Sequence, residues 1–225
     1  MDDCTFDDET ASQWINVIEA TKTSIRDKDI YPKVQSWVDY SPLSSVLEIG
    51  SGQGICSEKI DLKGNQYTGL EPSPKMTARA KELYSAKERN FVLGNVYALP
   101  FESNIFDGAF SILVWHLLRD LQSANLEVAR TLKPGGRFLI ITANPSSYSA
   151  WKAFYNDFQL DGKRLEGTMS LGANSLSHDV LYLHTQDELI QSFTSASLEV
   201  LKIETFRPSP KENLDLLISI EGRKI

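Results

Sequence analysis

The sequence is poor in cysteine and has no long apolar run. Its two cysteines, Cys4 and Cys56, lie far apart, with no CxxC pair and no histidine nearby at metal-ligand spacing. A disulfide framework or a metal site is therefore not expected, and a reducing compartment is the default. No apolar run approaches the roughly 20 residues that cross a bilayer as a helix. These absences predict a cytoplasmic protein that binds neither a metal nor a membrane.

The chain also lacks a surplus of basic residues. Its 225 residues include 23 Lys and Arg against 30 Asp and Glu, a net charge of −7, without a dense basic cluster. A nucleic-acid backbone is therefore not expected as the main partner. Residues 1–9 are acidic and lack the basic-then-apolar layout of a signal peptide. The length fits one large α/β domain.

The most informative stretch is residues 46–54, with the sequence VLEIGSGQG. An apolar strand runs into three glycines, and residues 55–60 can form a short helix. Glycine lets a backbone approach a ligand closely, so the segment predicts a ligand platform. The third glycine comes one residue early for the G-x-G-x-x-G turn of dinucleotide-binding proteins, and Ile55-Cys56 replaces the Lys-Ser or Lys-Thr of a P-loop. Both phosphate-binding interpretations are therefore weakened.

After this turn, strands and helices alternate. Further strands are expected at 66–71, 90–93, 105–114 and 137–142. Helices are expected at 74–87, where Ser73 is the N-cap and Pro74 the first residue, and at 121–132. No hairpin signal separates these strands. The alternation predicts a parallel, doubly wound sheet, with the ligand at the carboxyl ends of its strands.

The two ends of the chain differ from this pattern. Helices are expected at 11–28 and 31–40, where Trp37 packs on the sheet, while Trp14 and Tyr31 either pack or cover the ligand. A capping box that starts at Thr185 predicts another helix near the other end. Residues 198–206 and 214–221, joined by a loop through Pro208 and Pro210, read as an antiparallel strand pair that closes the sheet.

Between the fifth strand and that helix, residues 143–180 follow neither pattern. Five aromatic residues fall at helical spacing and predict a helix packed on the core, namely Tyr148, Trp151, Phe154, Tyr155 and Phe158. Residues 162–177 are then rich in Gly, Ser and Asn. Residues 144–148, NPSSY, compare poorly with the Asn-Pro-Pro-Tyr motif of methylases that act on nucleic-acid amines, so we interpret them as a loop.

The glycine turn and the motifs after it resemble those of class I S-adenosylmethionine-dependent methyltransferases. Glu48 begins the family's Glu-x-Gly-x-Gly-x-Gly pattern, and Glu71 matches the acid that binds both ribose hydroxyls. Residues 94–101, GNVYALPF, resemble the family's G-D-A…L-P-F stretch. Phe106-Asp107 and residues 132–136, LKPGG, complete five matches in the family's order over the middle hundred residues.

This resemblance implies S-adenosyl-L-methionine as cofactor, with S-adenosyl-L-homocysteine as product. It also implies a doubly wound, mostly parallel seven-stranded sheet with a C-terminal antiparallel strand pair. Asn95 stands where many relatives have Asp, and an altered affinity rather than lost binding is expected there. The implied cofactor contacts are Glu48, Gly50, Ser51, Gly52, Glu71, Pro72, Met76, Asn95, Val96 and Ser111.

We expect one methyltransferase domain over residues 1–225. Its parts are an N-terminal leader and helices at 1–42, a cofactor-binding core at 43–142, an inserted acceptor or lid segment at 143–180, and a C-terminal helix and strands at 181–225. The aromatic, weakly charged insertion favours a small organic acceptor. Whether an O, N or C atom is methylated stays open, as does the oligomeric state.

His116 is the best candidate for a catalytic base, because it follows the fourth strand, where the resemblance places the reactive methyl group. Its alternative role is packing or starting a helix. His178, His184, Tyr148 and Tyr155 are further candidates to face the acceptor, and their spacing does not rank them.

Two other functions are compatible with these motifs. One is a cofactor-binding partner or regulatory protein without catalysis. The other is a different group transferase on the same fold, such as an aminopropyl transferase. Enzymes of that kind carry paired acids near the strand ends, and no such pair follows the third or fourth strand here.

Overall fold

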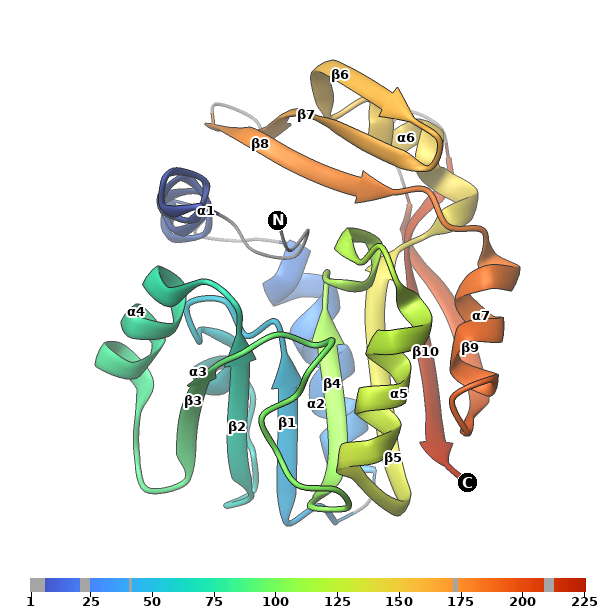
Figure 1. Ribbon diagram of the computed structural model, residues 1–225. Helices are drawn as coiled ribbons and strands as arrows, with labels where there is room; N and C mark the ends of the chain where they lie inside the picture. The colour runs from blue at the N-terminus through green and yellow to red at the C-terminus, as the bar shows by residue number, and fades with distance from the viewer. Residues whose placement is uncertain (1–6, 21–24, 41, 172–173, 209–212) are drawn as a thin grey trace.

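The computed structural model describes residues 7–20, 25–40, 42–171, 174–208 and 213–225, with the side chains of residues 20 and 171–178 left aside. Seven of its strands form one sheet: β1 (Ser45–Ile49), β2 (Gln66–Glu71), β3 (Arg89–Leu93), β4 (Phe106–Ile112), β5 (Leu132–Ala143), β9 (Leu198–Pro208) and β10 (Asp215–Lys224). Their order across the sheet is β3-β2-β1-β4-β5-β10-β9 (Figure 1).

The strand directions confirm the predicted fold class. β1 to β5 run parallel to one another, whereas β10 runs antiparallel to both β5 and β9. Parallel strands bring their carboxyl ends to one edge of the sheet, so the turns after β1, β2 and β4 meet there. This edge carries the site described below.

Helices cover both faces of the sheet. The helices on these faces are α2 (Tyr31–Asp39), α3 (Cys56–Lys59), α4 (Pro74–Tyr84), α5 (Leu121–Thr131) and α7 (Gln186–Thr194). α5 and α7 pack with Phe138 and Ile140 in one hydrophobic cluster, and α2, α3 and α4 pack with Phe110 and Leu139 in a second. The sheet is therefore buried on both faces, as its nearly all-apolar central strands predict.

Local signals set the starts of three of these helices. The Ser73 hydroxyl accepts from the Met76 N–H at 3.4 Å, and Pro74 begins α4. The Asp120 carboxylate accepts from the Ser123 N–H at 3.0 Å at the start of α5. The capping box at Thr185 is present at the start of α7. The N-caps predicted at Ser73 and Thr185 are thus confirmed.

The segment after β5 corrects the prediction of a long aromatic helix. Only a 3-10 turn, η3 (Pro145–Ser147), and the short α6 (Tyr148–Lys152) are helical. Tyr155 and Phe158 instead belong to β6 (Tyr155–Asp161), which pairs antiparallel with β7 (Arg164–Leu171), and β7 pairs antiparallel with β8 (Asn174–Tyr182). Gly162, at φ +57°, opens the two-residue turn between β6 and β7, a geometry that a helix cannot continue.

The N-terminal helices also differ from the expected single helix at 11–28. α1 (Asp8–Ala20) begins earlier and ends at Ala20, and a π-helix, η1 (Arg26–Ile30), leads directly into α2. The expected leader lies mostly outside the described residues, and so does part of the predicted Pro208–Pro210 loop. Among the described helices, none is both long and apolar enough to cross a membrane.

α1 lies above the carboxyl edge of the large sheet, between α4 and β8 (Figure 1). One side of α1 packs Ala11 and Ile15 against Met76 of α4. Val17 packs in a different cluster with Leu165 and Leu181 of the small sheet. α1 therefore bridges the cofactor-side helix and the β6–β8 sheet. It forms a roof over the ends of the strands.

Candidate functional site

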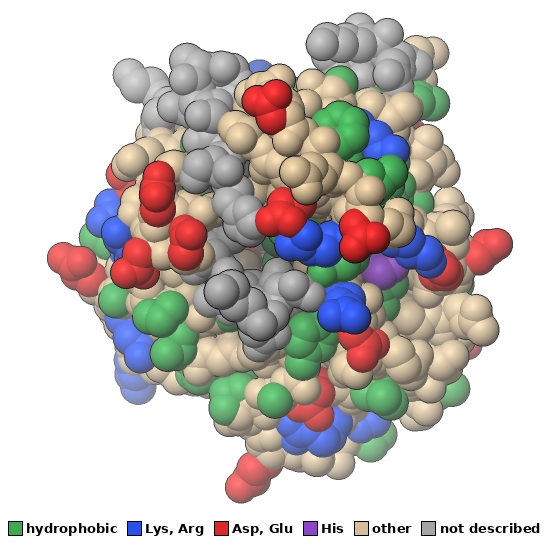
Figure 2. Space-filling view, turned by 45° about the horizontal axis from the view of Figure 1, so that its top comes forward, with side chains coloured by type: hydrophobic (Ala, Val, Ile, Leu, Met, Phe, Trp, Pro, Cys, Tyr) green, Lys and Arg blue, Asp and Glu red, His purple; other side chains and the backbone are tan. Residues whose placement is uncertain are grey.

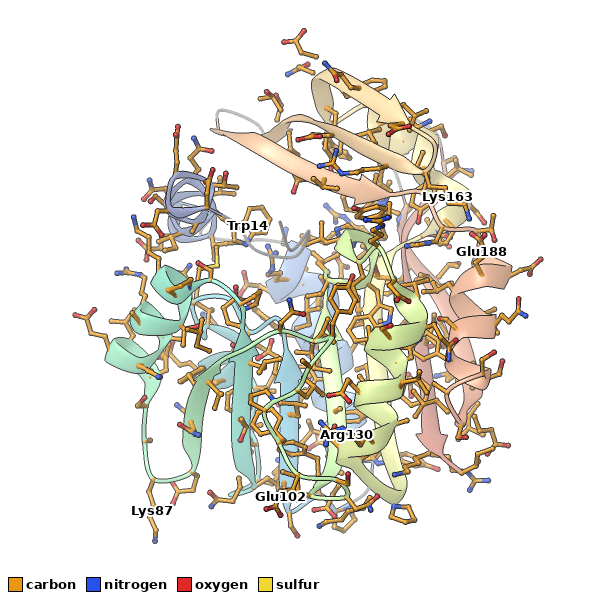
Figure 3. The ribbon with its side chains drawn as sticks, viewed as in Figure 1. Trp14, Lys87, Glu102, Arg130, Lys163 and Glu188 are labelled. Carbon is orange, nitrogen blue, oxygen red and sulfur yellow. The ribbon has the colours of Figure 1, made fainter. Side chains whose placement is uncertain are left out.

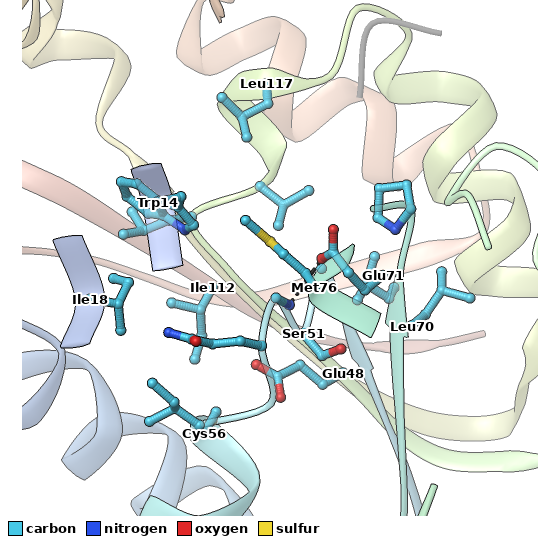
Figure 4. Close-up of a pocket in the computed structure, with 18 of the residues that line it drawn as sticks. Trp14, Ile18, Glu48, Ser51, Cys56, Leu70, Glu71, Met76, Ile112 and Leu117 are labelled. Atoms are coloured by element: carbon cyan, nitrogen blue, oxygen red, sulfur yellow. Dashed lines mark hydrogen bonds between the residues drawn. The ribbon is translucent and has the colours of Figure 1, made fainter. Parts of the chain in front are cut away.

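A cavity of about 130 Å³ lies between this roof and the strand ends (Figure 4). Its floor consists of the glycine turn after β1 and the ends of β2 and β4. Its remaining walls come from α1, η1, the starts of α2, α3 and α4, Val96 after β3, and the segment that follows β4 as far as Leu118. Figure 3 shows Trp14 pointing from α1 toward the space above the sheet.

The glycine turn holds its shape through its backbone. Gly50, Gly52 and Gly54 have φ values of +75°, +54° and +86°, a region that L side chains rarely adopt. The N–H groups of Gly50 and Ser51 donate to the Leu70 carbonyl at 2.8 and 3.0 Å. At Gly50 a Cβ would lie 2.3 Å from Cγ2 of Val114, so glycine is needed there for space as well as for conformation.

Glu71 ends β2 and holds the turn in place. One carboxylate oxygen accepts from the Gly52 N–H at 2.9 Å and the other from the Ser73 N–H at 3.0 Å. Burial raises the pKa of Glu71 to about 7, while the two backbone bonds oppose that rise. Each carboxylate oxygen has a second lone pair, so Glu71 can still accept hydrogen bonds from a ligand.

A second buried acid, Glu48, lies in the floor of the cavity. Burial raises its pKa to about 7, and the hydrogen bond donated by the Tyr67 hydroxyl acts in the opposite direction. Arg26 of η1 also lines the cavity, where its guanidinium lies 5.2 Å from the ring centroid of Trp14. Burial lowers the pKa of Arg26, and within the described part of the chain no carboxylate forms an ion pair with it. The cavity therefore contains a cation that a ligand anion can meet.

Two more polar atoms in the cavity wall are buried without a hydrogen-bond partner among the described residues. They are Oγ of Ser51 and Nε2 of Gln53, in side chains that are 7% and 6% exposed. Leaving such groups unpaired is costly, which indicates that a polar ligand completes the site.

Most residues expected to contact the cofactor do line the cavity. They are Glu48, Gly50, Ser51, Gly52, Glu71, Pro72, Met76 and Val96. Asn95 and Ser111 are not among the described residues that line it. The side-chain oxygen of Asn95 accepts from the Tyr97 N–H at 2.9 Å, and the buried Ser111 hydroxyl donates to the Ile49 carbonyl at 2.7 Å.

His116 does not belong to the described residues that line the cavity. Its Nδ1 lies 3.0 Å from the Thr142 hydroxyl, and its ring stacks on Trp151 with centroids 5.9 Å apart. Burial lowers the pKa of His116 to about 3, which makes the imidazole a weak base.

The other acceptor-facing candidates make structural contacts too. Nε2 of His184 lies 2.7 Å from the Leu118 carbonyl, and the Tyr155 hydroxyl donates to Asp179. The Tyr148 hydroxyl donates to the Tyr182 carbonyl at 3.2 Å. The side chain of His178 lies outside the described part of the molecule.

Several lining residues were not assigned from the sequence. Trp14 and Tyr31, which the sequence left between packing and covering the ligand, both line the cavity, as does Ile18. Arg26 and Gln53 carried no expectation. Gln53 could have been noticed as a polar side chain between two glycines, but a π-helix that turns Arg26 inward has no sequence signal.

Comparison with known proteins agrees with this geometry. Residues 47–140 match the family model described as "Methyltransferase domain". The chain is 31% identical over 117 residues to a malonyl-[acyl-carrier protein] O-methyltransferase of Salmonella typhimurium, covering 50% of this chain and 46% of that protein. It is 32% identical over 114 residues to an uncharacterized methyltransferase of Synechocystis, covering 49% and 53%. The chain thus spans about half the length of these relatives.

Solved structures share the fold at low sequence identity. An S-adenosylmethionine-dependent methyltransferase from Clostridium acetobutylicum aligns with a TM-score of 0.71 at 13% identity, over 95% of this chain and 97% of that one. The domain match, the strand order and the glycine turn together define the class. Residues 47–140 thus carry a methyltransferase domain, and the chain has the fold of the class I S-adenosylmethionine-dependent methyltransferases, whose cofactor is S-adenosyl-L-methionine.

Proposed function

We propose that this chain transfers the methyl group of S-adenosylmethionine to a small organic acceptor. The observation that carries the proposal is the joint placement of the glycine turn and Glu71. They form one floor under a cavity that also holds an unpaired buried donor and the cation of Arg26. These groups fit the parts of the cofactor, which are two ribose hydroxyls, an adenine ring and a charged amino-acid end.

In this proposal Glu71 accepts hydrogen bonds from the ribose hydroxyls with its remaining lone pairs. Pro72, Met76 and Val96 supply the apolar surface for the adenosine. The positive-φ turn brings its backbone against the amino-acid end, where Glu48 and Arg26 offer opposite charges.

Asn95 and Ser111 support the site from behind. Asn95 fixes the loop that carries Val96, and Ser111 ties the end of β4 to the end of β1. Residues 43–142 of a single domain then bind the cofactor. Residues 1–42 and 143–180 shape the acceptor side.

When bound, the cofactor supplies an activated methyl group on a sulfonium, so the protein need not generate an electrophile. The tasks left to this chain are to hold the acceptor in line and to keep water out, and positioning of this kind supplies a large part of a rate enhancement. The roof formed by α1, with Trp14 and Ile18 in the cavity wall, serves both tasks.

The groups of the cavity favour an acceptor that is already nucleophilic. The titratable side chains in the lining are Arg26, Tyr31, Glu48, Cys56 and Glu71, and this proposal assigns both acids to the cofactor. His116 as a base stays a prediction, but its burial and its contact with Thr142 favour a structural role. An ionised oxygen such as a carboxylate needs no base, which agrees with the name of the Salmonella relative as an O-methyltransferase.

The surface of the described residues favours a small molecule over nucleic acid. Acidic and basic side chains are interspersed on the face shown in Figure 2. Cations of the small sheet and its turn are paired, Lys163 with Glu188 and Arg164 with Glu166. Figure 3 shows Lys163 and Glu188 side by side where the small sheet meets α7. Paired charges of this kind offer little to a phosphate backbone.

Titration calorimetry with S-adenosylhomocysteine tests the cofactor assignment, and absence of heat at high ligand concentration would refute it. Transfer of a labelled methyl group from S-adenosylmethionine to panels of carboxylic acids, phenols and amines then tests the acceptor class. Turnover of alcohols or phenols but not of acids would contradict a pre-ionised acceptor. Cofactor binding without transfer to any panel would favour a non-catalytic binding protein.

A further inference from the structure

A polar relay joins the roof helix α1 to the glycine turn. Nε of Arg79, on α4, donates to Oε1 of Glu19 at 3.0 Å and to Oε1 of Gln53 at 3.1 Å. A terminal nitrogen of Arg79 also donates to Glu19. One guanidinium thus connects α1 with the residue between the second and third glycines of the turn.

The relay determines which end of the Gln53 amide faces the cavity. A guanidinium only donates, so the amide atom beside Arg79 must be the oxygen, and the NH2 group points away from it. Gln53 lines the cavity, and its Nε2 is buried without a partner among the described residues. The protein therefore holds an amide donor in place for an acceptor that a ligand must supply.

The position of this donor indicates which part of a ligand it meets. Glu19, which Arg79 binds, follows Ile18 in the sequence. Figure 4 shows Ile18 and Cys56 on the side of the cavity opposite Glu71. The Arg26 guanidinium lies 5.2 Å from the ring centroid of Trp14, which Figure 4 shows on this side as well, so a cation serves the same side. An amide donor together with a cation suits a carboxylate.

We propose that Gln53 Nε2 donates a hydrogen bond to the carboxylate of the cofactor's amino-acid end, and that Arg79 and Glu19 are its positioning residues. The inference rests on the proposed function, since S-adenosylmethionine carries this carboxylate at the end opposite its adenine. Because Arg79 binds both Gln53 and Glu19, cofactor binding and the docking of α1 are coupled. When the cofactor's carboxylate holds the Gln53 amide in place, Arg79 is also held in the position in which it binds Glu19 of α1.

The test compares two ligands in the absence of an acceptor. S-Adenosylhomocysteine has the amino-acid end, whereas 5′-methylthioadenosine keeps the adenosine and the thioether without the carboxylate. The Gln53→Glu variant keeps a partner for Arg79 but presents negative charge in place of the donor. Its affinity for S-adenosylhomocysteine should fall by about tenfold or more, the scale of a hydrogen bond to a charged group. Its affinity for 5′-methylthioadenosine should be unchanged, and the same binding shows that the variant is folded.

Variants of α4 distinguish the positioning of the Gln53 amide by Arg79 from contacts that only hold α1 in place. Arg79→Met should weaken S-adenosylhomocysteine several-fold relative to 5′-methylthioadenosine, and Arg79→Lys should restore part of that preference. The matched control is Lys75→Met, because Lys75 donates to the Ser12 hydroxyl and to the Asp8 carbonyl of α1 without touching Gln53. It should leave the ratio of the two affinities unchanged.

The outcomes are distinct. Equal losses for both ligands in Gln53→Glu, or an unchanged ratio, would overturn the proposal. A raised KM for the acceptor with an unchanged ratio would assign the donor to the acceptor's carboxylate, and this also overturns it. Failure of the unaltered protein to bind S-adenosylhomocysteine would refute the proposed function itself, before the relay is tested.

Discussion

Replacing Gly50 with alanine, beside the same change at Gly52, tests the geometry of the glycine turn. Both residues have positive φ, at +75° and +54°. A Cβ on Gly50 would lie 2.3 Å from Cγ2 of Val114, which packs against the main hydrophobic cluster. A Cβ on Gly52 would meet no atom within 4 Å. The two variants therefore share the conformational cost and differ in the steric one.

The expected magnitudes follow from these two terms. Holding an alanine in the left-handed region costs roughly 1–2 kcal/mol. The overlap with Val114 adds about 1–3 kcal/mol, because this short branched side chain has little freedom to move away. In a chain of this size each kcal/mol lowers the melting temperature by roughly 2–4 °C. Gly50→Ala should thus melt about 2–12 °C below Gly52→Ala.

Thermal unfolding followed by circular dichroism measures this difference. It should be recorded without cofactor, because a ligand that binds only the folded state would add its own stabilisation. Equal melting temperatures, or a less stable Gly52→Ala variant, would refute the steric argument and with it the described course of the turn.

Three further predictions concern buried titratable groups. Affinity for S-adenosylhomocysteine should fall as the pH drops below about 7, by up to about tenfold per unit, because the ribose hydroxyls need the ionised form of Glu71. Glu71→Gln should bind more weakly at high pH with a shallower profile by calorimetry, and identical profiles would contradict the ribose assignment. His116→Asn should lose less stability in acid than the unaltered protein, because burial lowers the pKa of His116 to about 3. Below pH ~6.5 the unfolded chain therefore takes up a proton that the folded chain does not. This uptake lowers the stability of the unaltered protein by about 1.4 kcal/mol per pH unit. Urea unfolding at two pH values checks this, and a collapse of methyl transfer in His116→Asn at unchanged stability would restore His116 as a base. Tyr67→Phe should raise the pKa of Glu48 further, because the hydrogen bond from the Tyr67 hydroxyl lowers that pKa. Carbon NMR of the Glu48 carboxyl measures the change, and an unchanged or lowered pKa would contradict the contact.

The order of the large sheet was predictable because its signals are local. Apolar runs, N-caps such as Ser73 and the glycine turn each act within a few residues, and their alternation allows few topologies. The small sheet was missed because the aromatic spacing from Tyr148 to Phe158 also suits a helix. The Asp161-Gly162 pair was the available hairpin signal, and it should have outweighed that spacing.

The same division holds at the site. The sequence predicts cofactor contacts at Glu48, Glu71, Gly50 and Gly52 because each belongs to a motif at the end of a strand, and these residues line the cavity. Arg26 and Gln53 were not, because their roles depend on residues brought close only by folding. Gln53 is oriented by Arg79, and Arg26 faces the cavity through a π-helix that no local pattern announces.

The packing of Val17 against Leu165 and Leu181 has a consequence for the order in which the site is assembled. The floor of the cavity comes from residues between β1 and β4, whereas its roof helix needs strands that a ribosome adds much later. α1 therefore leaves the ribosome before β7 and β8, and Val17 can pack on Leu165 and Leu181 only after residue 181 has been made. The wall of the cavity that α1 forms is thus completed after its floor, although α1 is made before that floor.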